Sequence, residues 1–316
     1  MNLAMVGLDE IRTAATRPLV FTAVQEALIA HAEGRTLAPP PVHLMFPDAN
    51  GDCHVKAGHV IGARHFTVKV ATSFYDNPQA GLSSNNGAVL VMSATTGAPL
   101  ALLADDGWLT AWRTAAAGAL ITHALTPADV RDVAILGTGV QARLQIEWLH
   151  ALRPLDHVKV WGRRAEGAER LSNDLNAVGI NADVTSLADA ASTACVITAT
   201  AAATPLAPAE AFADARHITA IGADMPGKNE LPPSLFSAAS TIATDDHTQC
   251  LDHGDFGSAV RAGHVRPDCD TEVGTILRGP YSRPPGSSIA DLTGIGVADA
   301  SVASAVLDSL AGIAVR

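Results

Sequence analysis

The stretch that decides the fold runs from residue 133 to residue 149 and reads VAILGTGVQARLQIEWL. An apolar strand pattern leads directly into a glycine-rich turn, and a helical pattern follows it. Gly137, Gly139 and Ala142 give the spacing G-x-G-x-x-A. The first glycine allows the tight turn, and the second lets the backbone approach a pyrophosphate whose charge meets the helix N-terminus. The turn that we predict to bind a dinucleotide comprises Gly137, Thr138, Gly139, Val140 and Gln141.

Apolar strand patterns alternate with helical patterns from this point to about residue 245. The strand-like segments span residues 133–137, 158–162, 182–186, 195–200, 218–223 and 241–245. Alternation at this spacing is typical of βαβ units, so we predict an α/β fold with a doubly wound, parallel Rossmann sheet. Ligands bind at the carboxyl ends of the strands in such sheets, which adds Thr200, at the end of its strand, to the predicted cofactor site.

The tip of the second strand bears on the choice of cofactor. A protein that binds NAD usually carries Asp or Glu there to hold the ribose hydroxyls, whereas an arginine accommodates the 2′-phosphate of NADP. This chain has Gly162, Arg163 and Arg164 at that place and no acid. Taken alone, the tip favours NADP or dual use; alternatively, Arg163 stacks on the adenine or faces solvent. We keep Arg163 as a candidate cofactor-binding residue.

The first hundred residues follow a different pattern. Residues 8–34 read as one amphipathic helix that Gly34 is placed to end. Short strand-like segments follow over residues 42–46, 53–60, 66–74, 88–94 and 98–104. Consecutive strands joined by tight Asn-Gly and Thr-Gly turns predict an antiparallel or mixed sheet. Alanine-rich residues 110–125 and the tail, residues 299–315, are predicted to form helices.

Bulk properties exclude several classes of protein. The chain has 316 residues, of which 48% are hydrophobic and 17% charged, a composition that argues against disorder. A net charge of −11 repels phosphate backbones, so nucleic acid is not an expected partner. The sequence shows neither a membrane-spanning apolar run nor a signal peptide pattern, which predicts a cytoplasmic protein without membrane contact. Its four cysteines form no C-x-x-C pair, so we expect reduced thiols and no metal.

Four further stretches carry candidates for chemistry. Lys69 lies inside the strand-like FTVKVATSF, and Arg113 lies on the alanine-rich helix in WRTAAAG. Asp224 follows a buried strand in ITAIGADMPGKNEL, at the strand end where ligands bind. A second glycine-rich turn, DLTGIGVAD, contains Gly296, which is a candidate cofactor contact. Each also has an ordinary interpretation, because a strand lysine is usually solvated and a helix arginine usually pairs with a surface acid.

Taken together, these motifs resemble the ornithine cyclodeaminase/mu-crystallin family. The resemblance covers residues from about 35 to about 300 and depends on the strand lysine, R-T-A-A-A, G-T-G-x-Q and G-x-D-x-P-G-K-x-E-L. It implies a Rossmann domain (residues 116–289) and an α+β substrate and dimerisation domain made from both chain ends (residues 1–115 and 290–316). It also implies a homodimer, in which Lys69 and Arg113 hold the substrate carboxylate and Asp224 works at the amino or imino centre.

The same residue types suit the chemistry when the family is set aside. Reducing a C=N bond next to a carboxylate needs a cationic clamp that orients the acid relative to the nicotinamide. It also needs a titratable group near the nitrogen, because the product amine gains a proton. Lysine, arginine and aspartate fill these requirements, so Lys69 and Asp224 are the candidate catalytic residues and Arg113 is a candidate substrate-binding residue.

The chain departs from the family members that close ornithine into proline. Those members carry an arginine early in the substrate domain and an acidic side chain for the distal amine. Here Pro41 stands at the place of the arginine, and His54 and Lys56 are basic. Strand alternation puts these two side chains on one face, where they would repel a distal ammonium and attract a second carboxylate. Alternatively, both point outward from an edge strand.

This version of the motifs, with GDCHVKAGH and the SSNNG stretch that contains Ser84, looks most like a subgroup near the ectoine-utilisation proteins and iminosuccinate reductase. The resemblance implies an imine reductase that converts iminosuccinate to L-aspartate with NADH, and Ser84 is a further candidate substrate contact. NADP(H) stays open because of Arg163. Reduction of the cyclic imino acid pyrroline-2-carboxylate, ornithine cyclodeamination and a mu-crystallin-like ligand-binding role stay open as alternatives.

Overall fold

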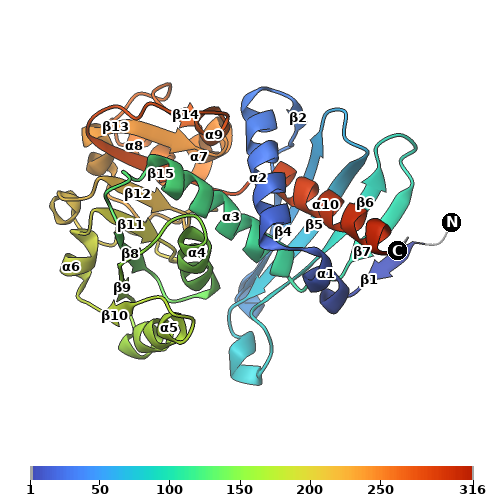
Figure 1. Ribbon diagram of the computed structural model, residues 1–316, viewed down its shortest axis with the longest axis horizontal. Coiled ribbons are helices and arrows are strands. Elements are labelled where there is room, and N and C mark those ends of the chain that lie inside the picture. Colours follow the sequence, from blue (N-terminus) through green and yellow to red (C-terminus); the bar gives the residue numbers. More distant parts are fainter. Residues whose placement is uncertain (1–2, 315–316) are drawn as a thin grey trace. The chain divides into compact units, whose positions relative to one another are not determined.

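The computed structural model describes residues 3–314, and its chain divides into two compact units. One unit contains the residues up to Arg113 together with those from Ile295 onward, and the other spans Thr114–Gly294. We call them the terminal unit and the nucleotide unit. Helix α3 (Trp108–Leu125) carries the chain from the first into the second. Figure 1 shows a sheet with helices in each unit.

Within the described residues the nucleotide unit contains an eight-stranded, all-parallel sheet in the order β10-β9-β8-β11-β12-β15-β13-β14. Its strands are β8 (Asp132–Leu136), β9 (His157–Trp161), β10 (Ala182–Val184), β11 (Cys195–Thr198), β12 (His217–Ala220), β13 (Ala239–Thr244), β14 (Thr271–Glu272) and β15 (Ser287–Asp291). The strand order reverses between β8 and β11, which is the place where ligands bind in such sheets. The predicted Rossmann architecture is therefore confirmed.

Helices cover this sheet and close its core. They are α4 (Val140–His150), α5 (Ala165–Ala177), α6 (Leu187–Ala191), α7 (His247–His253), α8 (Asp255–Arg261), α9 (Val273–Leu277) and the second half of α3. The part of the chain that the structure describes also contains 3-10 turns: η1 (Pro47–Ala49) and η2 (Asn77–Ala80) in the terminal unit, and η3 (Ala209–Phe212) and η4 (Pro233–Ala238) in the nucleotide unit. Buried Leu136, Val196, Ile218 and Phe256 belong to one apolar cluster, so central strands and a covering helix share a core.

Strand β15 was not predicted from the sequence. It reads SSIAD and lies between β12 and β13 inside the sheet, although it comes late in the chain. Two serines and an aspartate in five residues hide a buried strand from a reading based on apolar runs. The buried Ser288 is accommodated because its hydroxyl forms a hydrogen bond with the ring of His217 (2.9 Å) on the neighbouring strand.

The terminal unit contains a mixed sheet in the order β1-β7-β6-β5-β4-β2, with β3 also paired to β4. Its strands are β1 (Ala4–Val6), β2 (Thr36–Leu37), β3 (Val42–Phe46), β4 (Gly51–Val60), β5 (His65–Phe74), β6 (Asn85–Ser93) and β7 (Pro99–Leu103). The β1–β7 pair is parallel and the other pairs are antiparallel. This agrees with the prediction of an antiparallel or mixed sheet, and β4 is an interior strand rather than an edge.

The single helix predicted over residues 8–34 is wrong. The structure has two helices, α1 (Leu8–Ala14) and α2 (Arg17–Ala32), with a break at residues 15–16. Pro18 lies in the first turn of α2, and the hydroxyl of Thr16 accepts a hydrogen bond from Leu19 N (3.4 Å). A capping hydroxyl and a proline in the first turn are signals for a helix start, so the chain begins a second helix there.

The last helix, α10 (Gly296–Ala314), packs against α2 and strands β4 and β5 (Figure 1). The predicted end at residue 315 lies outside the described residues. Helix and strand meet backbone to backbone: a Cβ on Gly58 would lie 2.4 Å from Gly296 O, and one on Gly296 would lie 2.4 Å from Ala57 O. Only glycine permits this approach at both positions. The contact brings the first turn of α10 onto the middle of β4.

None of the helices within residues 3–314 has the length and apolar character of a membrane span.

Candidate active site

A buried carboxylate joins the two cations that the sequence singled out. Asp299, in the first turn of α10, accepts a hydrogen bond from Arg113 Nε at 2.8 Å and forms an ion pair with Lys69 Nζ at 2.8 Å. Lys69 comes from β5 and Arg113 from the first half of α3. All three residues are buried. The terminal unit therefore brings Lys69 and Arg113 together, and the link between them is an acid that sequence reasoning did not assign to the site.

Lys56 belongs to the same group. It is buried and pairs directly with Lys69 across the antiparallel β4–β5 ladder, so both side chains leave the sheet on the same face. The charge of Lys56 acts on both Lys69 and Asp299. We call Lys56, Lys69 and Arg113 the cation cluster. These three cations surround Asp299.

Burial and mutual repulsion change the acidity of this cluster. Burial is the main cause that lowers the pKa of Lys69 to about 7; Asp299 opposes this shift, and Arg113 and Lys56 add to it. Burial raises the pKa of Asp299, but Arg113 and Lys69 more than offset it, so that pKa lies below its ordinary value. Burial raises the pKa of Asp105, which the charge of Lys69 opposes; its carboxylate also caps the start of α3 by accepting a hydrogen bond from Leu109 N (2.8 Å). Asp299 is thus ionised at neutral pH, and Lys69 titrates near neutral pH.

His54 shares the strand face of Lys56 but has different partners. Its Nε2 lies 3.2 Å from a carboxylate oxygen of Asp52, whose other oxygen accepts a hydrogen bond from Tyr75 (2.9 Å). The ring of His54 also contacts that of His43, at 4.5 Å between centroids. From the sequence, His54 and Lys56 were expected to act together. In the structure His54 lies beside the carboxylate of Asp52, and only Lys56 belongs to the cation cluster.

Ser84 lies at the hairpin between β5 and β6. Its carbonyl accepts a hydrogen bond from Phe74 N at 2.7 Å, which places it five residues along β5 from Lys69. At about 3.3 Å per residue this is roughly 16 Å, so the structure does not place Ser84 beside the cation cluster.

The glycine-rich turn of the nucleotide unit has the geometry that a pyrophosphate needs. Gly137 directly follows β8 and has φ +134°, and a Cβ there would lie 2.3 Å from Ala199 O, just after the neighbouring strand β11. Gly139 is the N-cap of α4, and a Cβ there would meet no atom within 4 Å. Val140, in the first turn of α4, is exposed. The open backbone at a helix N-terminus fits the diphosphate of a dinucleotide, and this cofactor would supply or accept a hydride.

Thr138 packs inward rather than toward that open space. A Cβ on Gly162 would lie 2.3 Å from its methyl group, and one on Gly167 would lie 2.9 Å from its hydroxyl. The glycine at the tip of β9 is therefore explained by packing. Arg163 follows it and is exposed, as is Arg164. Gln141 lies one turn before Gln145, which donates to it at 3.4 Å.

A buried glutamate that was not predicted from the sequence, Glu230, organises the carboxyl ends of β11 and β12. Glu230 accepts hydrogen bonds from Thr198 Oγ1 (2.7 Å), from both N (2.6 Å) and Oγ1 (2.7 Å) of Thr200, and from Gly222 N (2.7 Å). Burial and the neighbouring Asp255 raise its pKa to about 7. Thr200 is thus held at the reversal of strand order. The E of the motif G-K-x-E-L was the available signal.

Asp224 lies in the loop after β12 and is partly exposed. Its Oδ1 accepts a hydrogen bond from Lys228 Nζ at 2.7 Å. It belongs to the nucleotide unit, whereas the cation cluster belongs to the terminal unit. Gly296 belongs to the terminal unit, where its contact with β4 accounts for the glycine. Among the described residues, no group of three or more His, Cys, Asp or Glu side chains is arranged to hold a metal ion.

A Rossmann sheet with an open glycine turn at its reversal point, in a chain that also buries the cation cluster, is typical of an NAD(P)-dependent oxidoreductase. The chain belongs to the ornithine cyclodeaminase/mu-crystallin family, whose model matches residues 4–313. The family resemblance seen in the sequence is therefore confirmed.

Relatives of known structure share the whole fold. An archaeal alanine dehydrogenase dimer with bound NAD is 28% identical, with a TM-score of 0.90 over 99% of this chain and 98% of the other. The iminosuccinate reductase of Paracoccus denitrificans in complex with NAD+ is 25% identical, with a TM-score of 0.88 over 100% and 98%. An uncharacterized cyclodeaminase of Sinorhizobium fredii is 36% identical over 84% of this chain and 82% of its own.

The open space at Gly139 generates a prediction for the cofactor site. In Gly139→Val the new side chain should occupy the approach of the pyrophosphate, while the fold survives because nothing lies within 4 Å of the Cβ. NADH affinity, measured by quenching of protein fluorescence, should fall at least tenfold with an unchanged unfolding temperature. Gly279→Val, at another glycine with an open Cβ position, is the control and should bind NADH normally. Unchanged affinity in Gly139→Val would place the pyrophosphate elsewhere.

Proposed function

We propose that this protein is an NADH-dependent imine reductase that forms an amino acid with an acidic side chain, with iminosuccinate as substrate and L-aspartate as product. The observation that carries the proposal is the cation cluster: Lys56, Lys69 and Arg113 lie together in a buried site around Asp299. A site that gathers several basic side chains attracts an anion. A substrate carboxylate is such an anion.

Lys56 is the residue that favours a dicarboxylate. In this proposal Lys69 and Arg113 hold the carboxylate next to the imine, and Lys56 adds a further buried cation that attracts a second acid group. Iminosuccinate brings two carboxylates, whereas the imines of pyruvate and pyrroline-2-carboxylate bring one. An ammonium at the far end of the substrate, as in ornithine, would be repelled by Lys56. His54 is a weaker candidate for the second carboxylate, because it already lies beside Asp52.

The reaction adds a hydride to the imine carbon and a proton to the imine nitrogen. Bound NADH supplies the hydride. We propose that Arg113 and Lys69 hold the carboxylate next to the imine, so that the carbon presents one face to the hydride donor. Asp224 handles the proton at nitrogen, a role that its position after a strand end permits. Lys69, which titrates near pH 7, is the second group able to move a proton.

The preference for NADH is also part of the proposal. The related alanine dehydrogenase and iminosuccinate reductase structures hold NAD or NAD+. Gly162 packs on Thr138, and Arg163 and Arg164 are exposed beyond it, so an arginine contact to a 2′-phosphate stays open. Comparing KM for NADH and NADPH tests this choice; a lower KM for NADPH contradicts it.

Alanine formation from pyruvate and ammonia is the second candidate. The similarity to the alanine dehydrogenase favours it, because that structure superposes with the higher TM-score of the two relatives compared. The two reactions share the carboxylate clamp and the hydride transfer, and they differ in the group next to the reacting carbon. We therefore expect Lys56 to favour the substrate that forms aspartate over the one that forms alanine.

Substrate choice gives the decisive assay. NADH oxidation at 340 nm should proceed with oxaloacetate plus ammonia at least ten times faster in kcat/KM than with pyruvate plus ammonia, because a charged hydrogen bond contributes about 1.5–3 kcal/mol. Lys56→Met should erase most of that preference, chiefly by raising KM for the dicarboxylate. Lys159→Met, which changes a lysine of β9, is the matched control and should keep the preference.

Two results would contradict the aspartate-forming assignment. One is a wild-type enzyme that prefers pyruvate or pyrroline-2-carboxylate in this assay. The other is a Lys56→Met protein that keeps the dicarboxylate preference. In either case the clamp of Lys69 and Arg113 would still serve a monocarboxylate imine.

The role of Asp224 predicts a loss of rate rather than of binding. Asp224→Asn should lower kcat by roughly 100- to 10,000-fold, the usual scale for a general acid or base, and remove one limb of the pH–rate profile. KM for NADH should change little. Asp214→Asn, at an exposed position of the same unit, controls for surface charge. A modest loss with an intact profile would assign the proton to Lys69 or to water.

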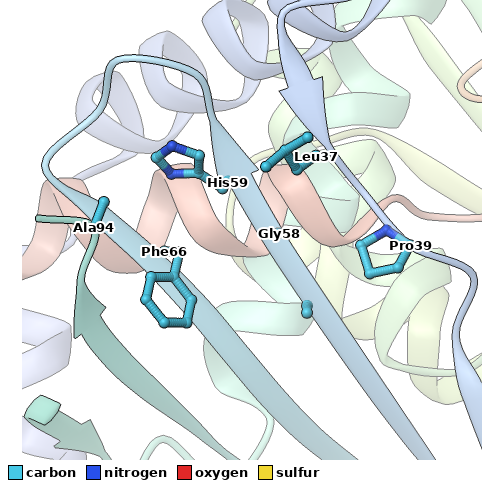
Figure 2. Close-up of a pocket in the computed structure, with 7 residues that line it drawn as sticks. Leu37, Pro39, Gly58, His59, Phe66 and Ala94 are labelled. Atoms are coloured by element: carbon cyan, nitrogen blue, oxygen red, sulfur yellow. The ribbon is translucent and has the colours of Figure 1, made fainter. Parts of the chain in front are cut away.

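We also propose that the chain forms a homodimer through the face of the terminal sheet that is opposite the cation cluster. Exposed Val42 and Val70 lie on this face. Beside them a hollow of about 380 Å³ lies over β4 and β5, lined by Leu37, Pro39, Ala57, Gly58, His59, Phe66 and Ala94 (Figure 2). Exposed apolar surface of this kind marks contact sites. The related alanine dehydrogenase structure is a dimer.

Light scattering tests the dimer directly. The molar mass should be twice the 32.5 kDa of one chain, and Val70→Glu should shift it toward one chain. Val178→Glu, at an exposed valine of the nucleotide unit, should leave the mass unchanged. A wild-type mass of 32.5 kDa across the micromolar range would contradict the proposal.

A further inference from the structure

Asp299 contacts both Lys69 and Arg113 and is suited to hold these two cations in place. Each of its carboxylate oxygens is assigned to a different partner: Oδ1 to Arg113 Nε and Oδ2 to Lys69 Nζ, both at 2.8 Å. Its exposed side-chain fraction is 3%, and that of Lys69 is also 3%. Water therefore does little to stabilise either charge, and each depends on the other.

We propose that Asp299 is the positioning residue of the substrate clamp: it keeps Lys69 in the charged form and sets the orientation of the Arg113 guanidinium. The inference rests on the proposed role of Lys69 and Arg113 as the holders of the substrate carboxylate. Asp299 contacts neither the reacting atoms nor the carboxylate in this proposal. It acts by fixing the two cations that do.

The charged groups around Lys69 make Asp299 the main opposing influence on its titration. Lys56 on β4 and Arg113 on α3 repel a proton from Lys69, and burial has the same effect. Asp105, at the start of α3, is itself attracted to the charge of Lys69, but burial raises its pKa and it also caps the helix through Leu109 N. Asp299 is the acid that forms an ion pair with Lys69, at 2.8 Å.

Arg113 gains orientation from the same carboxylate. The bond to Asp299 uses Nε, one of the five N–H donors of the guanidinium. The two terminal nitrogens are the pair that a substrate carboxylate meets in a parallel, two-bond contact. Holding Nε therefore fixes the plane in which that contact forms. Asp299 is itself held in place, because the backbone contact of Gly58 and Gly296 anchors the first turn of α10.

The lysine content of the chain makes a direct measurement possible. The sequence contains four lysines: Lys56, Lys69, Lys159 and Lys228. Protein labelled with ¹³C at lysine Cε gives four side-chain signals, which single Lys→Arg or Lys→Met variants assign. Titration of these signals reports the charge of Lys69 in the protein without substrate or cofactor.

In the wild type the Lys69 signal should titrate with a midpoint about pH 7. In Asp299→Asn the midpoint should fall by about one to three pH units, because the neighbouring negative charge that favours the ammonium is gone. In Lys56→Met it should rise, because a repelling cation is gone. The Lys159 signal is the internal control and should not move. If Asp299→Asn does not fold, Asp299→Ser removes the same charge with a smaller side chain.

A Lys69 midpoint that stays within 0.3 pH units of the wild type in the neutral Asp299 variant would overturn the proposal.

Kinetics then separate this inference from the proposed function. With oxaloacetate plus ammonia, Asp299→Asn should raise KM for the oxaloacetate at least tenfold, with little effect on KM for NADH. The limb of the kcat/KM profile that reports Lys69 should shift together with the NMR midpoint, and Asp299→Glu should restore part of the activity. A shifted midpoint with an unshifted kinetic profile would keep the Asp299–Lys69 coupling and remove Lys69 from the clamp.

Discussion

The terminal unit depends on one backbone contact, the crossing of α10 over β4 at Gly58 and Gly296. A side chain at either position would lie 2.4 Å from a carbonyl oxygen of the other element, so the helix can reach the sheet only because both residues are glycine. The crossing places the first turn of α10 over the strand that carries Lys56 and next to the strand that carries Lys69. Asp299 reaches both Lys69 and Arg113 from that turn. A small shift of the helix would separate a buried acid from its cations, which is a costly arrangement.

Buried charge of this kind is poor evidence for stability and good evidence for function. Replacing such a group with apolar residues is often neutral or stabilising, so a fold has no general reason to keep three cations and an acid inside. In the function proposed above, a substrate carboxylate joins this cluster. Burial lowers the pKa of Lys69 to about 7, and in that proposal the same residue holds an anion or releases a proton near neutral pH.

The nucleotide unit uses a buried acid in a different way. Glu230 collects hydrogen bonds from the ends of β11 and β12, so the loops that border the reversal of strand order are tied to one side chain. Asp255 in turn accepts bonds from the backbone nitrogens of Glu230 and Leu231, at 2.8 and 3.1 Å. Backbone groups at the edge of the sheet are thereby held in place beside an open glycine turn. Such preorganisation suits a site that must position a cofactor accurately.

The sequence by itself determined the parts that local chemistry encodes. The glycine turn after an apolar strand, and the alternation of strands and helices, were enough for the Rossmann sheet, because close approach and parallel pairing leave residue patterns. The motifs around Lys69, Arg113 and Asp224 were enough for the family. Apolar periodicity continues from α1 into α2, so periodicity alone does not separate the two helices; the cap at Thr16 and Pro18 in the first turn of α2 do.

Only the tertiary structure decided which charged residues meet. Asp299 is 230 positions from Lys69 and 186 from Arg113, and no local pattern links an acid in a helix start to a lysine in a strand. His54 and Lys56 are basic residues on the same strand face, yet one lies beside Asp52 and the other joins the cation cluster. Strand β15 lies between β12 and β13 inside the sheet, and its Ser288 forms a hydrogen bond with His217 of β12. Long-range pairing, which no sequence window contains, is the physical reason that these features were not predicted.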